Sequence, residues 1–285
     1  MGIKIFFIGI IFLIVIYAIT LNYARFRWEK GTLELRARLE AARAPIQHKI
    51  VDFCELDGLP KPVQRFFRHV LKDGAHMVIT ARVQHKGTFN MGEKKERWKP
   101  FTSDQLVIAQ RAGFDWNGRI SIIPGFSVQV HDAYIAGEGI LHAALLGLFP
   151  IVDIRGKGDV AEGELMRFFA EAAWYPTALL PSQGVRWEGV DDFSARGTLH
   201  DGQLSVSMLF TFNEHSLIDT VRAEARGRMV SGQVIPTPWL GHFWNYQERA
   251  GMVIPLEGEV AWLLNEGPRP YWRGRIIKIV YEFAQ

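Results

Sequence analysis

Three charged residues share one helical face in the segment GELMRFFAE. Arg167 follows Glu164 by three residues and precedes Glu171 by four, which is the spacing of neighbours on a helix surface. On an exposed helix such a triad contributes only about 0.2–0.5 kcal/mol per pair. The flanking residues are mostly apolar, so we expect a largely buried helix whose charges are paired and directed into a polar cavity. Both carboxylates are then candidate general acids or bases, and Arg167 is a group that orients a substrate.

Glu138 and the pair Trp174-Tyr175 extend this set of candidates. Glu138 lies between two glycines, a pattern that serves a strand-to-helix turn or else projects a carboxylate into a ligand cleft. Trp174 and Tyr175 follow the acidic helix directly, where they either pack beneath its end or form a pocket wall with Tyr175 as the polar handle. In a pocket, Glu138 would be a third candidate acid or base.

Aromatic residues are concentrated in two further segments. PTPWLGHFWNY, residues 236–246, contains Trp239 and His242; core packing explains it most simply, and a pocket rim or a membrane-touching surface is the alternative. Trp272 and Arg273 lie on the last expected strand, where arginine can stack on an aromatic ring of a neighbouring strand. The predicted ligand-binding residues are Glu138, Glu164, Arg167, Glu171, Trp174, Tyr175, Trp239, His242, Trp272 and Arg273.

Common catalytic and cofactor-binding motifs are absent from the sequence, which has no GxGxxG, GxxxxGK[ST], HExxH, CxxC or GxSxG. The nine histidines show no metal-binding spacing, and Cys54 is the only cysteine, so we expect no metal, no cofactor and no intrachain disulfide. The net charge is +3 and the basic residues are spread along the chain. Nucleic acid is therefore not expected as a partner, because nucleic-acid binders concentrate basic residues on one face.

An apolar segment near the N-terminus predicts a membrane anchor. Residues 5–21 are apolar at every position except Thr20. About seventeen residues span roughly 26 Å as a helix, at the short end of the range for a transmembrane segment. A cleaved signal peptide is the alternative, but its apolar region usually has only about 7–15 residues. Tyr23, Phe26 and Trp28 follow as an aromatic belt of the kind that fixes a helix end at the membrane interface.

The elements that position these residues follow from the apolar periodicity. Residues 32–43 predict a short helix with Thr32 as its N-cap, and residues 59–72 predict a second helix with Pro62 in its first turn. The apolar period then changes to two, most clearly in Leu204–Phe212. The expected strands cover residues 77–89, 105–109, 114–116, 119–123, 126–134, 151–154, 196–199, 204–212, 217–227, 252–264 and 271–283.

Two apolar helices are expected to interrupt this series, one at residues 139–148 and one in the segment 163–180, where Pro176 ends the helix. Short strands with turns between them indicate an antiparallel sheet. The predicted fold class is mainly β with inserted helices (α+β): a curved antiparallel sheet or incompletely closed β-barrel with helices against its concave face, preceded by one N-terminal transmembrane helix. Residues 1–30 are predicted as anchor and flank, 31–58 as a helical connector and 59–285 as a single β-rich domain.

Five segments together resemble a bacterial family of unknown function that occurs in membrane-anchored proteins: GEGILHAALLGLFPIVD, GELMRFFAEAAWYPTALLP, RWEGVDDFSARGTL, PTPWLGHF and YWRGR. The resemblance covers roughly residues 59–283 and implies no catalytic residues. In layout the chain is loosely similar to lipoprotein carriers of the LolA/LolB type, which hold acyl chains in an apolar cavity. The resemblance implies a single-pass protein of the bacterial inner membrane. The carrier layout favours a periplasmic body, whereas the basic residues after the anchor favour a cytoplasmic one.

The leading hypothesis is a membrane-anchored protein that binds a lipid-like or other apolar ligand in a β-barrel cavity. Its motivation is the aromatic excess, the apolar helices within a β series, and an anchor that keeps the cavity near membrane lipid. An enzyme that uses Glu138, Glu164 or Glu171 as acid or base is the alternative, and it is the less favoured one. A third possibility is a scaffold whose PTPW segment docks a partner membrane protein.

Overall fold

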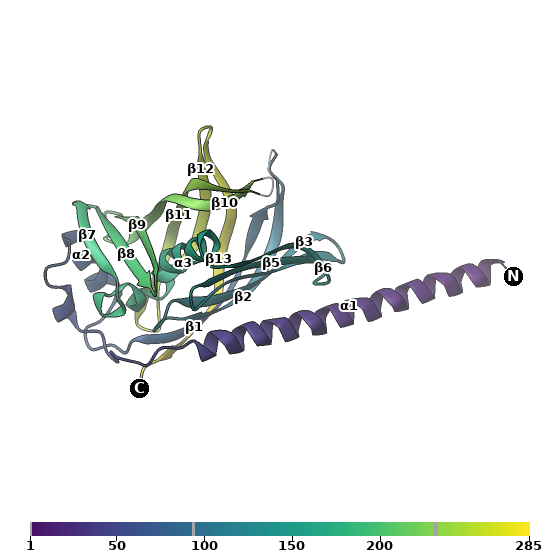
Figure 1. The fold of residues 1–285 in the computed structure, drawn as a ribbon, viewed down its shortest axis with the longest axis horizontal. Coiled ribbons are helices and arrows are strands. Elements are labelled where there is room, and N and C mark those ends of the chain that lie inside the picture. The colour runs from purple at the N-terminus through teal and green to yellow at the C-terminus, as the bar shows by residue number, and fades with distance from the viewer. Residues whose placement is uncertain (1, 93–94, 231–232) are drawn as a thin grey trace.

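The structure, a computed structural model, describes residues 2–92, 95–230 and 233–285. Over these residues a long N-terminal helix, α1 (Gly2–Ala41), precedes a strongly curved sheet (Figure 1). Two further α-helices are α2 (Lys61–Val70) and α3 (Asp159–Glu171), and three short 3-10 helices follow α3 as far as Gln183. The strands are β1 (Val78–Asn90), β2 (Trp98–Ile108), β3 (Gly113–Ile123), β4 (Phe126–Ile135), β5 (Glu138–Leu145), β6 (Phe149–Gly156), β7 (Arg186–Asp191), β8 (Ser194–Asp201), β9 (Leu204–Phe212), β10 (Ile218–Val230), β11 (Gln233–Arg249), β12 (Met252–Leu264) and β13 (Gly267–Phe283).

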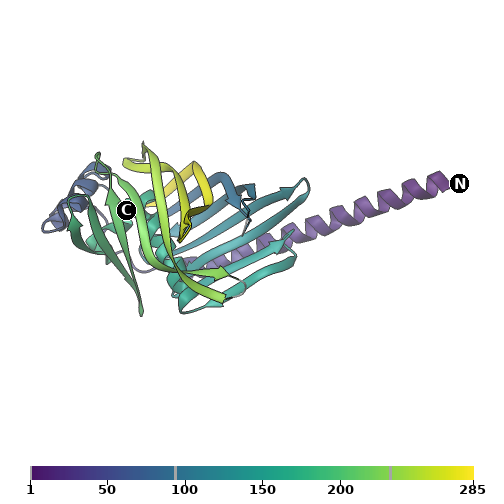
Figure 2. The same cartoon turned by 90° about the horizontal axis from the view of Figure 1, so that it is seen from above.

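All thirteen strands in the described part of the chain belong to one antiparallel sheet, in the order β6-β5-β4-β3-β2-β1-β13-β12-β11-β10-β9-β8-β7. Two meanders, β1–β6 and β7–β13, are joined where β1 pairs with β13. The sheet does not close, since β6 and β7 are its two edges, and it curls into a trough (Figure 2). The predicted fold class, an incompletely closed antiparallel sheet with a helix against its concave face, is confirmed.

Helix α3 occupies the hollow of this trough, against β5, β9 and β10 (Figure 1). Its apolar side chains Leu165, Phe168 and Phe169 are buried there. The helix begins at Asp159, four residues before the expected start, and ends at Glu171, after which 3-10 turns continue to Pro176 and beyond. The burial expected from its composition is therefore correct, and its charged face lies inside the molecule.

The helix expected at residues 139–148 is wrong, because this segment forms strand β5, which pairs with β4 and β6. Ala136 and Gly137, both with positive φ, form the two-residue turn that joins β4 to β5. On one face of β5, Ile140 is covered by α1, and on the other Leu141 borders the interior cavity. In a strand that is buried on both faces, apolar residues no longer alternate with polar ones. The continuous apolar run of β5 was therefore mistaken for a helix.

The separate helix expected from Thr32 is also wrong, because α1 runs without a break to Ala41. Thr32 does not cap a new helix: its hydroxyl donates to the Trp28 carbonyl oxygen 3.0 Å away, within the same helix, and lies 3.0 Å from His131 of β4. Residues 236–246 lie within strand β11. The sequence had predicted core packing for this segment, with a pocket rim as the alternative.

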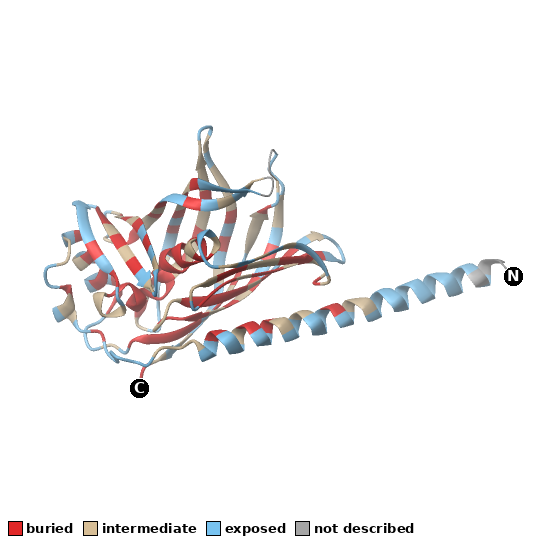
Figure 3. Ribbon diagram, in the orientation of Figure 1, coloured by how far each residue is buried: buried red, intermediate tan, exposed pale blue. Residues whose placement is uncertain are grey.

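The C-terminal half of α1 packs on the outer face of the sheet, where Leu35 and Leu39 contact Ile140 and other residues of β2, β4 and β5. Arg36 donates to the fully buried carboxylate of Asp115 on β3 at 2.9 Å. The N-terminal half extends away from the body, and residues 6–19 are exposed (Figure 3). From Phe6 onward this helix is long and apolar enough to cross a membrane, with a mean hydropathy of 2.3 in its most apolar window.

Candidate functional site

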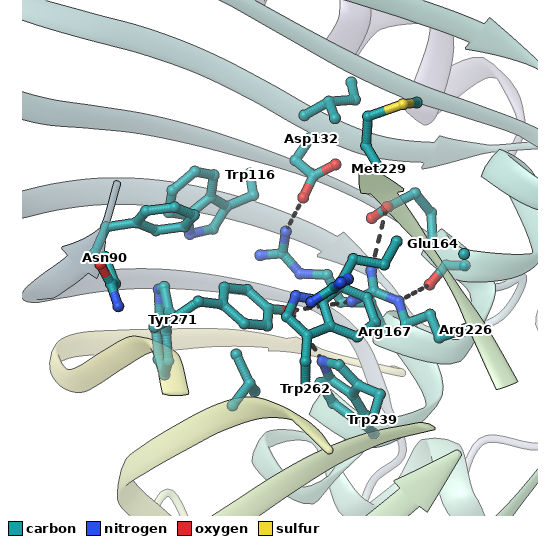
Figure 4. A pocket seen from close by; sticks show the side chains of 18 of the residues that line it. Asn90, Trp116, Asp132, Glu164, Arg167, Arg226, Met229, Trp239, Trp262 and Tyr271 are labelled. Carbon is teal, nitrogen blue, oxygen red and sulfur yellow. Dashed lines mark hydrogen bonds and ion pairs between the residues drawn. The ribbon is translucent and has the colours of Figure 1, made fainter. Parts of the chain in front are cut away.

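A cavity of about 780 Å³ lies between α3 and the concave face of the sheet (Figure 4). Most of its lining is apolar and comes from many strands, because successive inward positions of a curved sheet converge on one space. The apolar lining residues are Phe89, Met91, Trp116, Ile120, Val130, Leu141, Ile154, Val160, Ala170, Trp174, Met229, Val230, Val234, Trp239, Phe243, Val260, Trp262, Pro270, Tyr271 and Trp272.

One wall of the cavity carries a cluster of five charged side chains, which we call the ionic cluster. Its members are Glu164, Arg167 and Glu171 of α3, Asp132 of β4 and Arg226 of β10. The spacing along α3 brings its three members to one face, as the sequence predicted, and all three line the cavity. Glu164 and Arg167 are labelled in Figure 4. The cluster is held in a low-dielectric region, so its ion pairs interact more strongly than pairs on a surface.

Arg167 is the centre of one half of the ionic cluster. Its Nε donates to Glu171 at 2.7 Å and its Nη1 donates to Asp132. The guanidinium lies 5.0 Å from the ring centre of Phe114 and 5.2 Å from that of Trp116, within the range of cation–π attraction. The two partners of Arg167 lie on different elements, Glu171 on α3 and Asp132 on β4, so the arginine links α3 to β4.

Arg226 is the centre of the other half. It donates to the Gly163 carbonyl oxygen at 3.0 Å, to Glu164 at 3.3 Å and to the Tyr271 hydroxyl at 3.1 Å. The Trp239 indole donates to the same hydroxyl at 2.9 Å. The Tyr271 oxygen thus accepts two hydrogen bonds from the described residues, and its hydroxyl can still act as a donor at the cavity that it lines.

The ionic cluster has one more acid than base, since three carboxylates face two guanidinium groups. Two of its oxygens, Oδ1 of Asp132 and Oε2 of Glu164, are buried without a hydrogen-bond partner among the described residues. Burial, and next the charge of Asp132, raise the pKa of Glu164 from 4.5 to about 8. A proton on Glu164 balances the charges and supplies a donor to this pair of carboxyl groups.

The remaining predicted residues divide between the cavity and the rest of the molecule. Trp174, Trp239 and Trp272 line the cavity together with the α3 triad. Tyr175 is buried beside it, and its hydroxyl donates to the Phe168 carbonyl oxygen at 2.9 Å. It packs beneath the end of α3, so it is a structural residue of the helix terminus in this arrangement.

Three predicted residues lie outside the cavity. Glu138 begins β5 and forms an ion pair with Arg38 of α1, 2.5 Å apart, because the expected turn into a helix is a hairpin turn. His242 is exposed on β11, next to the inward-facing Phe243. Arg273 follows the inward Trp272 and therefore points outward, where it pairs with Glu259. The alternation of strand side chains explains the last two placements.

Sequence reasoning missed Asp132, Arg226 and Tyr271. Asp132 has a detectable signal, because it lies in phase with the buried Val130 and Tyr134 on an alternating strand. Arg226 has none, since a bulge between Ala223 and Arg226 changes which residues of β10 face inward. Across the part of the chain that the structure describes, no group of three or more His, Cys, Asp and Glu side chains is arranged to hold a metal ion.

Comparison with known proteins identifies the family. Residues 57–281 match the Family of unknown function (DUF6920), and the chain belongs to this family. The resemblance expected from the sequence is thereby confirmed. No curated protein matches the chain.

Two solved structures are similar in layout. A LolA superfamily protein of Nitrosomonas europaea is 14% identical, with a TM-score of 0.36, over 72% of this chain and 86% of that chain. A β-barrel-like protein of Brucella abortus with a domain of unknown function, DUF1849, is 11% identical, with a TM-score of 0.21, over 72% of this chain and 99% of that chain.

Proposed function

We propose that this protein binds a lipid-like or other apolar ligand in the cavity between α3 and the sheet, while α1 anchors it in a membrane as a single-pass protein. The observation that carries the proposal is the cavity itself. Its volume of about 780 Å³ falls within the range of about 300–1,000 Å³ that is usual for small-molecule sites. Its lining is mostly aromatic and aliphatic, and the ionic cluster is among its polar groups.

The lining favours a ligand with an apolar chain on energetic grounds. Each methylene group transferred from water to such a surface gains about 0.8 kcal/mol, so a chain of eight carbons gains roughly 6 kcal/mol. The ionic cluster and the Tyr271 hydroxyl offer hydrogen bonds to a polar end of the ligand. Anchorage by α1 would keep the cavity close to a membrane, which is the reservoir of such molecules.

The test uses the full-length protein in lipid nanodiscs and a fluorescent fatty-acid analogue. Trp262, a half-buried cavity residue, is changed to glutamine, and the exposed Trp244 of β11 is changed in the same way as the matched control. We expect Trp262→Gln to weaken probe binding at least tenfold and Trp244→Gln to leave it unchanged. Native mass spectrometry of the released protein should show one co-purified apolar molecule.

Two results would contradict the proposal. Absence of both probe uptake and any co-purified molecule would remove the binding function. Equal affinity of the Trp262→Gln variant and the wild type would place the bound probe outside this cavity. Circular dichroism of both variants shows whether a loss of binding comes from unfolding.

A second candidate function, acid–base catalysis, is supported by the environment of Glu164. Its pKa of about 8 keeps this carboxyl protonated at neutral pH beside the carboxyl of Asp132. A carboxyl group whose burial keeps it protonated at neutral pH can act as a general acid. The test is incubation of the full-length protein with extracted bacterial lipids, followed by mass spectrometry. Turnover that Glu164→Gln abolishes would support catalysis, and unchanged lipids would count against it.

A further inference from the structure

The hairpin tips β3–β4 and β5–β6 lie beside the exposed half of α1. Both views of the molecule show these hairpins running alongside the helix, on the side toward its N-terminus (Figures 1 and 2). A hydrogen bond fixes the position of the first tip, because the Tyr17 hydroxyl donates to the Gly125 carbonyl oxygen at 2.9 Å. The rings of Tyr17 and Phe126 lie 6.2 Å apart. The β3–β4 tip is therefore level with residue 17 of the helix.

That level lies inside the apolar segment of α1. Tyr17 precedes Leu21, the last residue of the apolar run, by four positions, which is about 6 Å along a helix. If the apolar run is within the hydrocarbon, the β3–β4 tip is at least as deep as the boundary between hydrocarbon and head groups. Residues Ala24 to Leu39 of α1 pack on strands β2–β5. This packing fixes the position of the helix relative to the two hairpin tips.

The side chains at both tips suit an apolar surrounding better than water. Ile123 and Phe126 of the β3–β4 tip are 58% and 40% exposed, and Phe149 and Ile151 of the β5–β6 tip are 60% and 58% exposed. Four large apolar side chains at two adjacent tips form an exposed apolar patch next to the anchor. Such patches on soluble surfaces mark contacts with membranes or proteins.

Basic groups lie at the level expected for lipid head groups. Arg25 and Arg119 are exposed, and neither forms an ion pair among the residues that the structure describes. Together with Gly125, Ser127 and the acid Glu29 they border a hollow of about 530 Å³ between α1 and the outer face of the sheet. Arginines at this depth match the phosphates of an anionic bilayer surface.

We infer that the β3–β4 and β5–β6 hairpin tips form a membrane-contact surface that enters the interface of the bilayer that α1 crosses. The inference rests on the proposed anchorage by α1. Its occupant is a phospholipid bilayer with anionic head groups. The same strands lead into the cavity, since Ile120 of β3 and Ile154 of β6 line it. An apolar molecule leaving the bilayer at these tips would therefore meet Ile122 and then Ile120, which are two residues or about 7 Å apart on the same face of β3.

The test places an environment-sensitive fluorophore at single cysteines in the full-length protein. The background is Cys54→Ser, since Cys54 is the only cysteine in the sequence and is exposed. The labelled variants are Phe126→Cys and Phe149→Cys at the tips, Phe12→Cys in α1, and Phe193→Cys as the matched control. Phe193 is 58% exposed in the turn between β7 and β8. The protein is reconstituted in phosphatidylethanolamine–phosphatidylglycerol vesicles that contain nitroxide-labelled lipid.

We expect blue-shifted emission and at least twofold quenching by head-group-level nitroxide at positions 126 and 149, and the emission of a water-exposed probe at position 193. Deep nitroxide should quench position 12. Quenching of the probe at position 12, together with water-like emission from the probes at positions 126 and 149, would overturn this inference. The same result would leave the proposed membrane anchorage by α1 intact. Water-like emission at all four positions would overturn the anchor as well.

Discussion

Glu164→Gln should change how the stability of the protein depends on pH. The pKa of Glu164 is raised from 4.5 to about 8, mainly by burial and secondly by Asp132. Nη2 of Arg226 lies 3.3 Å from Oε1 of Glu164. The other charged residues of the ionic cluster are Arg167 and its partner Glu171. The variant keeps the shape of a protonated glutamic acid and removes only its titration. Any difference in pH dependence between the two proteins therefore reports this one carboxyl group.

The sign of the effect follows from proton binding. Between pH 4.5 and 8 the folded state keeps the proton on Glu164, whereas the unfolded state has lost it. The folded state thus binds more protons, and the free energy of unfolding of the wild type falls as the pH rises. The contribution of this group is fully present below pH 4.5 and is lost as the pH passes 8.

The magnitude is about 1.4 kcal/mol per pH unit for one proton. From pH 5.5 to 7.5, the wild type should lose about 3 kcal/mol relative to the variant, or roughly 6–12 °C in melting temperature for a domain of this size. The variant should be close to the wild type at pH 5 and more stable than it at pH 8. Circular dichroism melts of the full-length protein in a non-ionic detergent measure this difference.

Tyr175→Phe provides the control, because it removes a buried hydrogen bond to the Phe168 carbonyl oxygen and no carboxyl group. Its loss of stability, about 1 kcal/mol, should be the same at every pH below 9. The reasoning is refuted if the melting temperatures of wild type and Glu164→Gln run parallel from pH 5 to 8. Parallel curves would mean that Glu164 is ionised throughout and that its charge is compensated in another way.

Three further variants test the packing around the site, each by chemical denaturation of the full-length protein. Arg226→Met should cost about 3 kcal/mol by leaving buried acceptors unpaired, and the loss should grow as the pH rises above 8, where Glu164 of the wild type ionises beside Arg226. A loss that does not change with pH would contradict the pairing. Arg36→Met should cost about 3 kcal/mol, because it leaves the fully buried Asp115 beneath α1 without this partner. It should also speed hydrogen exchange in the C-terminal half of α1. Unchanged exchange would refute the docking of α1 on the sheet through Arg36. Gly87→Ala would place a methyl carbon 1.9 Å from a carbonyl oxygen of β13, so the variant should be destabilised by more than about 2 kcal/mol. A variant as stable as the wild type would show that β1 and β13 are less closely paired.

The curved antiparallel sheet was predictable because most strands have one buried and one exposed face. In β9 the buried positions Val206, Met208, Phe210 and Phe212 alternate with more exposed ones, as the apolar pattern of the sequence indicates. Strand β5 lacks this contrast, since α1 covers its outer face. That cover comes from residues about a hundred positions earlier in the chain, and local periodicity contains no information about it.

The ionic cluster of the candidate site was predictable only where its residues lie on one element. The α3 triad follows from helical spacing, and the apolar flanks of α3 indicate that the triad is buried. Asp132 and Tyr271 join the site through the curvature of the sheet, which brings β4 and β13 to the same cavity. Glu138 was placed there in error, because the turn before it continues into a strand and directs its side chain to α1.

The charge balance of the cavity depends on one irregularity in β10. Before the bulge the buried positions Val221 and Ala223 alternate with the less buried Arg222, and after the bulge the buried position is Arg226. In a regular strand Arg226 would point outward, and Glu164 would be buried in α3 without its arginine. A buried polar group that loses its hydrogen-bond partner is destabilised by about 1–3 kcal/mol, so the bulge stabilises the position of Glu164 and α3 against β10. The bulge and the burial of α3 are therefore coupled, and the one proton that Glu164 carries in the ionic cluster is the property that a pH titration can detect.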